Sequence, residues 1–223
     1  MILGLLSELG VTIMKSPEGQ LCRQDCTASQ PRVITMNTNY SKIKCIVMLV
    51  LFVGSVNAAD INAGKSRAAA CQGCHGVAGV SSSPLWPSLA GQSATYLESQ
   101  LNKFSTGQRA NEVMKPIAAG LSDVDMQNIA AYYAGLPPAK SRGGDFNLAQ
   151  QGKDKAAMCL GCHGNNAQGM GMVPKLAGQH PQYLAKQLTD FKKGARKSPQ
   201  MNAMAQSLSE EDIKAVAAYL GSL

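Results

Sequence analysis

Residues 64–76 read GKSRAAACQGCHG, and residues 152–164 read GKDKAAMCLGCHG. The Gly-Lys pair, both cysteines, the histidine and the last glycine recur at an offset of 88 residues. From Leu89 onward the offset becomes 87, and 20 of the 48 positions from there to the end of the chain are identical in the two copies. The chain therefore contains two copies of one module, and one residue was gained or lost between the histidine and Leu89.

The Cys-x-x-Cys-His motif of each copy predicts covalent attachment of a haem. Two thiols three positions apart on a helical turn can bond the two vinyl groups of one haem, and the next residue presents an imidazole to the iron. A thioredoxin-like dithiol would accompany a βαβ pattern, and a zinc site would need a second ligand pair nearby. We expect two covalently bound haem c groups per chain, held by Cys71, Cys74 and His75 in the first copy and by Cys159, Cys162 and His163 in the second.

Both copies show helical patterns, and neither shows sustained alternation of period two. Apolar residues from Tyr96 to Phe104 lie at helical spacing, and Ser122 opens the last helix of the first copy with a capping-box-like sequence that Ser209 repeats. Aromatic residues make up only 5% of the chain, so something other than side chains must fill two cores of this size. The fold is predicted as all-α, with two tandem small domains, each wrapped around one covalently bound haem: residues 60–137, a Pro- and Gly-rich linker over 138–145, and residues 146–223.

The sixth ligand of each iron decides between electron transfer and catalysis, because an occupied position suits a carrier and an open one permits chemistry. Met114 and Met201 form the only methionine column that the two copies share. We therefore expect them to bind the iron opposite His75 and His163, with Met204 as the nearest rival of Met201. The third histidine, His180, precedes Pro181 at a predicted helix start and is interpreted as a helix cap or a surface residue.

Residues 36–58 carry the three parts of a secretory signal. Two lysines precede an apolar run of about 12 residues, and Val56 and Ala58 are the small residues of a cleavage site. Cleavage near Ala58 would place the mature chain in the periplasm, whereas a retained anchor is the alternative. Residues 1–35 are interpreted as the result of a start codon assigned upstream of the true start at Met36. The alternative is a real N-terminal extension that carries the pair Cys22 and Cys26.

The charge of residues 59–223 favours acidic partners weakly. This part of the chain carries 16 lysines and arginines against 11 aspartates and glutamates, and most of the excess lies in the second half. Such a modest excess does not indicate nucleic acid as a partner, although it leaves loose association with a membrane surface open. The most basic local feature is interpreted as a solvated helix end, with partner docking as the alternative: Lys192, Lys193, Arg196 and Lys197.

The repeated motifs resemble those of the two-haem cytochromes c4. The resemblance covers residues 60–223 and rests on Gly-Lys-x5-Cys-x-Gly-Cys-His-Gly, Leu-Ala-Gly-Gln, the methionine segment that starts at Met114, and Ile-Ala-Ala-Tyr-Tyr. It implies two class I cytochrome c domains with His/Met iron. It also implies that Pro87 and Pro174, which align across the copies, accept hydrogen bonds from the Nδ1 atoms of the two axial histidines.

This resemblance implies a periplasmic dihaem electron carrier and no enzyme. Its expected donor is a quinol-oxidising complex of the respiratory chain, and its expected acceptor is a terminal oxidase. The alternative is a cytochrome subunit of a flavoprotein dehydrogenase, such as a sulfide-oxidising flavocytochrome c. A two-haem peroxidase would need an iron with an open or displaceable ligand, and the shared methionine column argues against it.

Overall fold

The first copy of the module consists of helices separated by loops. Asp60 caps its first helix, because its side chain accepts hydrogen bonds from the backbone N–H groups of Asn62 and Ala63. The computed structural model describes residues 58–141 and 144–223, and it places these elements in the first copy: α1 (Ile61–Ala68), η1 (Ala69–Cys71), α2 (Gln72–His75), η2 (Val77–Gly79), α3 (Ala94–Ser105), α4 (Met114–Ala119) and α5 (Asp123–Ala134). The predicted extension over 1–35 and all but the last residue of the predicted signal over 36–58 lie outside the described residues.

The second copy repeats this order with one difference at its start. A single helix, α6, spans the segment that is broken into α1, η1 and α2 in the first copy, and Asp145 caps it. The elements of the second copy are α6 (Phe146–His163), α7 (Pro181–Lys192), α8 (Pro199–Gln206) and α9 (Glu210–Ser222). In both copies the Cys-x-x-Cys-His motif therefore ends a helix.

The last helix of each copy begins with the capping box that the sequence predicts. The side chain of Ser122 accepts from the Asp125 N–H, and the Asp125 carboxylate accepts from the Ser122 N–H. Ser209 and Asp212 form the same reciprocal pair at the start of α9. Each box satisfies two backbone donors that a helix leaves unpaired, and it places a negative charge at the positive end of the helix dipole.

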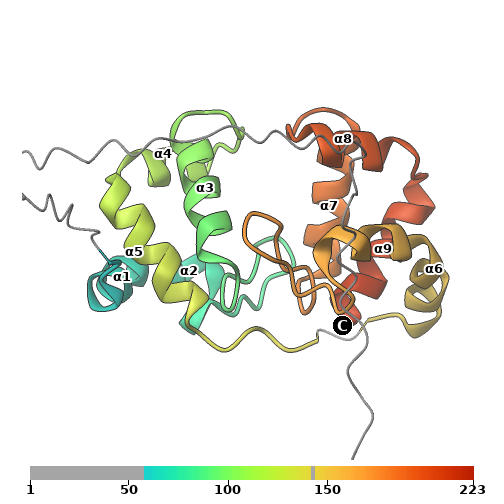
Figure 1. Cartoon of the computed structure of the whole chain (residues 1–223), viewed down its shortest axis with the longest axis horizontal. Coiled ribbons are helices and arrows are strands. Elements are labelled where there is room, and N and C mark those ends of the chain that lie inside the picture. The colour runs from blue at the N-terminus through green and yellow to red at the C-terminus, as the bar shows by residue number, and fades with distance from the viewer. Residues whose placement is uncertain (1–57, 142–143) are drawn as a thin grey trace, which may run out of the picture. The chain divides into compact units, whose positions relative to one another are not determined.

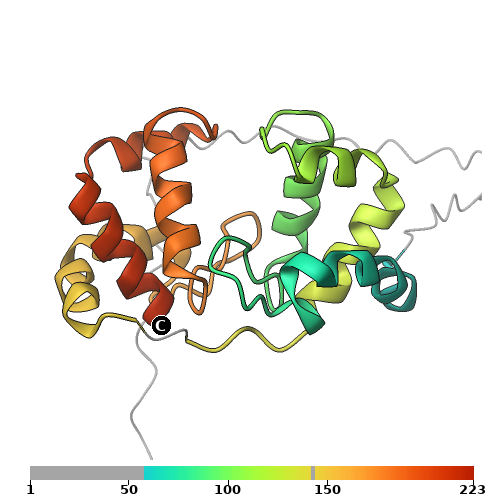
Figure 2. The same cartoon turned by 180° about the vertical axis from the view of Figure 1, so that it is seen from behind.

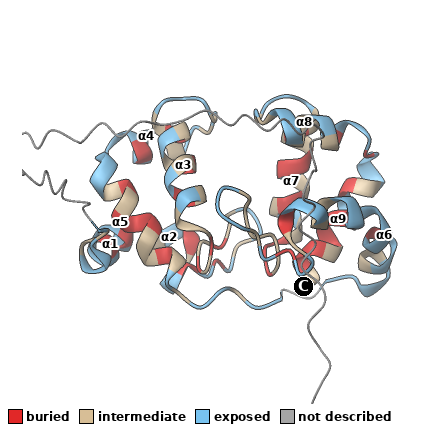
Figure 3. Ribbon diagram, viewed as in Figure 1, coloured by how far each residue is buried: buried red, intermediate tan, exposed pale blue. Residues whose placement is uncertain are grey.

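Each copy has its own small core. In the first copy α5 packs against α1 and α3, and in the second copy α9 packs against α6 and α7. The apolar stripes of the last helices face inward as predicted, and they include Ile129 and Tyr133 in α5 and Val216 and Leu220 in α9. Figure 3 shows buried residues where these helices meet, and further buried residues in the loops.

The two copies lie side by side, with their loops facing each other between the helices (Figures 1 and 2). The described residues belong to one compact unit. Among them the only extended pairing is an isolated bridge between Met170 and Val173, so the predicted all-α class is confirmed. None of the described helices combines the length and the apolar character needed to cross a bilayer.

The loop after each motif contains the single-residue difference between the copies. In the first copy the backbone oxygen of Gly79 accepts from the N–H groups of Leu89 and Ala90, and in the second copy that of Ala167 accepts from Leu176 and Ala177. These equivalent bonds close a loop over residues 80–88 in the first copy and over 168–175 in the second. The extra residue of the first copy therefore lies in this loop.

The close approach of α1 and α5 depends on a glycine. A Cβ atom at Gly64 would lie 2.1 Å from the backbone oxygen of Asn128. We expect Gly64→Ala to lower the free energy of unfolding of the holoprotein by about 1–3 kcal/mol, because the two helices would have to move apart. Urea titration followed by circular dichroism measures this change. Gly135→Ala is the control, since its Cβ would meet no atom closer than 3.6 Å, and equal stability of the two variants would contradict the prediction.

Candidate functional site

The two cysteines of each motif differ in exposure. Cys71 and Cys159 are half-buried, whereas Cys74 and Cys162 are exposed, and none of the four forms a disulfide. Burial is the main cause that raises the pKa of the Cys71 and Cys159 thiols. Each pair therefore offers one sulfur atom beside a core and one at the surface, which suits two-point attachment of a flat apolar group.

Each motif histidine is oriented by a proline carbonyl. Nδ1 of His75 lies 2.8 Å from the backbone oxygen of Pro87, and Nδ1 of His163 lies 2.8 Å from that of Pro174. Since a carbonyl oxygen only accepts, Nδ1 carries the hydrogen, and the lone pair of each neutral ring is on Nε2. This is the hydrogen bond that the family resemblance implies.

Burial keeps both imidazoles neutral at neutral pH. His75 and His163 are only 7% and 6% exposed. Burial lowers the pKa of each ring, and the proline carbonyl opposes this shift only in part. A neutral imidazole with a fixed tautomer and a lone pair on Nε2 is the form that binds iron.

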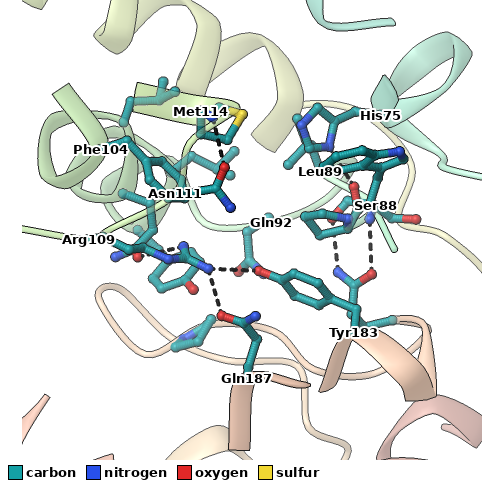
Figure 4. Close-up of a pocket in the computed structure, with 18 of the residues that line it drawn as sticks. His75, Ser88, Leu89, Gln92, Phe104, Arg109, Asn111, Met114, Tyr183 and Gln187 are labelled. Carbon is teal, nitrogen blue, oxygen red and sulfur yellow. Dashed lines mark hydrogen bonds between the residues drawn. The ribbon is translucent and has the colours of Figure 1, made fainter. Parts of the chain in front are cut away.

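A cavity of about 520 Å³ opens beside His75. Met114, at the start of α4, lies on the other side of this cavity in the view of Figure 4. Asn111 fixes this turn, because its side-chain oxygen accepts from the Met114 N–H at 2.8 Å. The wall between the two is mainly apolar and includes Cys71, Leu89, Leu97, Leu101, Phe104, Ile129 and Tyr133. Size, apolar lining, thiol, imidazole and thioether all fit the haem that the motif predicts.

The second copy places the equivalent residues in the same order. Met201 lies in α8 and packs against the core cluster that Cys159 and Leu176 also contact. The side chain of Asn202 holds α8 on the end of α7, since its Nδ2 donates to the backbone oxygens of Phe191 and Arg196 at 2.6 and 2.8 Å. Met204 is likewise half-buried.

Two arginines connect the copies. Arg109 donates to Gln100 of its own copy at 2.9 Å and to Gln187 of the other copy at 2.7 Å. Arg196 does the same in reverse, with Gln187 at 2.6 Å and Gln100 at 2.9 Å. The interpretation of Arg196 as part of a solvated helix end is therefore wrong, although Lys193, which belongs to the same cluster, is exposed.

The same arginines also bind a tyrosine of the opposite copy. Arg109 donates to the Tyr183 hydroxyl at 3.0 Å, and Arg196 donates to the Tyr96 hydroxyl at 2.8 Å. Burial opposes ionisation of the Tyr183 phenol, but the charges of Arg109 and Arg196 outweigh it and lower its pKa. Both arginines also line the cavity, as do Glu112 and Asp190. Figure 4 shows Arg109 beside Tyr183 and Gln187.

The prediction that His180 is a helix cap or a surface residue is wrong for its side chain. His180 is the N-cap residue of α7 by position, but its side chain makes no capping hydrogen bond. The side chain is 7% exposed, and its Nε2 lies 2.9 Å from the backbone oxygen of Ser81 in the first copy. Contact with a loop 99 positions away hides it, and no local pattern around Pro181 signals that contact.

Sequence reasoning missed the residues that join the copies. They include Gln92, Tyr96, Gln100 and Arg109 in the first copy and Gln179, Tyr183, Gln187 and Arg196 in the second. One signal could have found them, because all four pairs are polar columns that are identical in the two copies. A polar residue that is identical in both copies is a candidate for a specific partner.

Comparison with known proteins agrees with this geometry. The family model "Cytochrome c" matches residues 149–223, and the model "Cytochrome C oxidase, cbb3-type, subunit III" matches residues 59–132. Cytochrome c4 of Pseudomonas aeruginosa is 36% identical over 199 residues, which cover 81% of this chain and 98% of that protein. A thiosulfate dehydrogenase electron acceptor of Stutzerimonas stutzeri is 34% identical, covering 70% of this chain and 80% of that protein.

A solved structure gives the same result. The crystal structure of reduced cytochrome c4 from Pseudomonas stutzeri matches with a TM-score of 0.70 and 37% identity, covering 74% of this chain and all of that chain. Two cytochrome c segments, each with one Cys-x-x-Cys-His motif, carry two covalently bound haem c groups. The predicted cofactor content is thereby confirmed.

Replacing both cysteines of one motif should remove one haem only. In Cys159→Ala/Cys162→Ala we expect the haem content to fall by half, because the first copy keeps its own thiols and its own core. A pyridine haemochrome assay on purified protein measures this content. Met158→Ala, which changes an exposed side chain next to Cys159, should keep both haems. Two covalent haems in the double variant would refute the assignment.

Proposed function

Because the chain belongs to the cytochrome c4 family, we propose that it is a periplasmic carrier of single electrons between a quinol-oxidising complex and an acceptor such as a terminal oxidase. The observation that carries this proposal is that each copy offers an oriented, neutral imidazole together with a methionine. In this proposal His75 and Met114 would hold one haem iron, and His163 and Met201 would hold the other. Two irons with both axial positions filled suit electron transfer and leave no site for a substrate.

The residues of each copy would bind the haem, orient it and exclude water from it. The cysteines would fix the haem at the end of a helix, and the proline carbonyl keeps the imidazole in one tautomer, with its lone pair on Nε2. The apolar wall around Leu97 and Ile129 keeps water out. Haem c supplies a one-electron iron couple when bound, and a thioether ligand raises its potential.

The paired arginines are the groups available to haem propionates. No described carboxylate forms an ion pair with Arg109 or Arg196, although both residues are half-buried and the charge of Asp190 acts on Arg109. Two like charges that share the neutral acceptors Gln100 and Gln187 favour an anionic partner between them. We assign this partner as the propionates at the edge of the cavity.

A second candidate concerns the donor. The relative from Stutzerimonas stutzeri is described as an electron acceptor of thiosulfate dehydrogenase, so a dehydrogenase of an inorganic sulfur compound is an alternative source of electrons. Stopped-flow reduction of the oxidised chain by a quinol-oxidising complex and by such a dehydrogenase distinguishes the two. Stable co-purification of a flavin polypeptide would instead favour the role of a flavoprotein dehydrogenase subunit.

Substitution of a methionine should open one iron. In Met201→Ala we expect the far-red sulfur-to-iron band of the oxidised protein to lose about half its intensity, because one of two thioether ligands is gone. The potential of that haem should fall, and its ferrous form should bind carbon monoxide. Absorption spectra with and without carbon monoxide measure both effects.

Met204→Ala is the matched control, since Met204 lies in the same helix and is also half-buried. It should retain the full band. Loss of the band in Met204→Ala but not in Met201→Ala would show that the ligand is misassigned. Rapid binding of carbon monoxide to the wild type would instead favour a peroxidase.

Export should produce a shortened chain. Since Val56 and Ala58 are the small residues of a predicted cleavage site, we expect protein from the periplasmic fraction to begin at Ala59 or within a few residues of it. Intact mass and N-terminal sequencing decide this. A periplasmic chain that retains residues 1–58 would contradict both the signal and the interpretation of residues 1–35.

A further inference from the structure

The Leu-Ala-Gly-Gln motif of each copy ends in a buried glutamine that reaches into the other copy. Gln92 and Gln179 are each 7% exposed, and each precedes the N-cap residue of a helix, α3 or α7. Within its own copy, the amide oxygen of each glutamine accepts from the backbone N–H of the next residue, Ser93 at 3.0 Å or His180 at 3.1 Å. A buried polar side chain at the end of a repeated motif needs a specific partner.

Each glutamine forms two hydrogen bonds with one backbone residue of the opposite copy. Oε1 of Gln179 accepts from the Ser88 N–H at 2.9 Å, and its Nε2 donates to the Ser88 oxygen at 3.0 Å. Gln92 pairs with Lys175 in the same way, at 2.8 and 2.9 Å. Figure 4 draws the two bonds at Ser88 as dashed lines. Such pairing fixes the position of a backbone segment as a neighbouring β-strand would.

Ser88 and Lys175, the residues that the glutamines hold, directly follow the two prolines whose carbonyls orient the motif histidines. The Ser88 N–H and the Pro87 C=O belong to the same planar peptide group, and so do the Lys175 N–H and the Pro174 C=O. The described residues contain no cis peptide bond, so the N–H and the C=O of each group point in opposite directions. One hydrogen-bonded chain therefore runs from the glutamine of one copy through a single peptide group to Nδ1 of the histidine of the other copy.

We propose that Gln179 and Gln92 are positioning residues that act across the interface, Gln179 on His75 and Gln92 on His163. A peptide group whose N–H is already bonded is polarised, so its C=O is a stronger acceptor. A stronger bond to Nδ1–H makes the imidazole a more basic ligand, which favours ferric over ferrous iron. Each domain thus lowers the reduction potential of the haem in the other domain. This inference rests on the proposed axial roles of the two histidines.

The test is a redox titration of the holoprotein followed by nuclear magnetic resonance, which resolves the two haems. In Gln179→Leu the reduction potential of the first haem should rise, and that of the second haem should stay unchanged. Gln92→Leu should produce the mirror result, so that each variant is the control of the other. In the reduced protein the Nδ1–H of the affected histidine should exchange with solvent roughly tenfold faster, as loss of one buried hydrogen bond implies.

Two further variants keep the test decisive if leucine disturbs folding. Gln179→Asn keeps the polar group but shortens its reach, so it should raise the first potential in the same direction. Gln179→Glu keeps an acceptor for the Ser88 N–H, so this variant should not raise the reduction potential of the first haem. A potential that stays constant in Gln179→Asn, or that changes equally at both haems, would overturn the proposal.

The wild-type spectrum separates this inference from the proposed function. If His75 or His163 does not bind iron, its ring protons will lack the shifts that a haem causes, whatever residue stands at position 179. If both histidines bind iron and the glutamine variants leave the opposite haem unchanged, only the role of the glutamines is refuted.

Discussion

An imidazole that is fixed at the end of a helix is the constraint on which each half of this chain depends. The motif places two cysteines and the histidine on one helical turn. A proline carbonyl oxygen, 2.8 Å from the Nδ1 atom of the histidine, then fixes the orientation of the ring. The loop that carries the proline must return to this point, and the methionine helix must lie across the cavity. The last helix and its capping box supply the wall against which the first helix packs.

Features that depend on neighbours in sequence could be predicted from the sequence, and features that depend on distant partners could not. Helical stripes, capping boxes and the haem motif are local patterns, and the structure places them as expected. His180 and Arg196 were misinterpreted because their partners lie 96–100 positions away. The pairing of Met114 with His75 was inferred from one shared column, and the structure brings both residues to the same cavity.

The interface has consequences for the two redox centres because it is built from the same loops that hold the axial histidines. Ser81, Ser88 and Lys175 belong to the segments between each motif and its Leu-Ala-Gly-Gln sequence, and each of them is bonded to a side chain of the other copy. A disturbance at the contact between the copies would therefore reach the ligand environment directly, without passing through either core.

The contacts of the two arginines are reciprocal between the copies. Arg109 bonds Gln187 and Tyr183, and Arg196 bonds the aligned residues Gln100 and Tyr96. Exchange of equivalent partners in this manner defines an isologous, twofold symmetric interface. A single module carrying these residues would be complementary to a second copy of itself. The contact between the two copies therefore has the geometry of a twofold-symmetric dimer interface within a single chain.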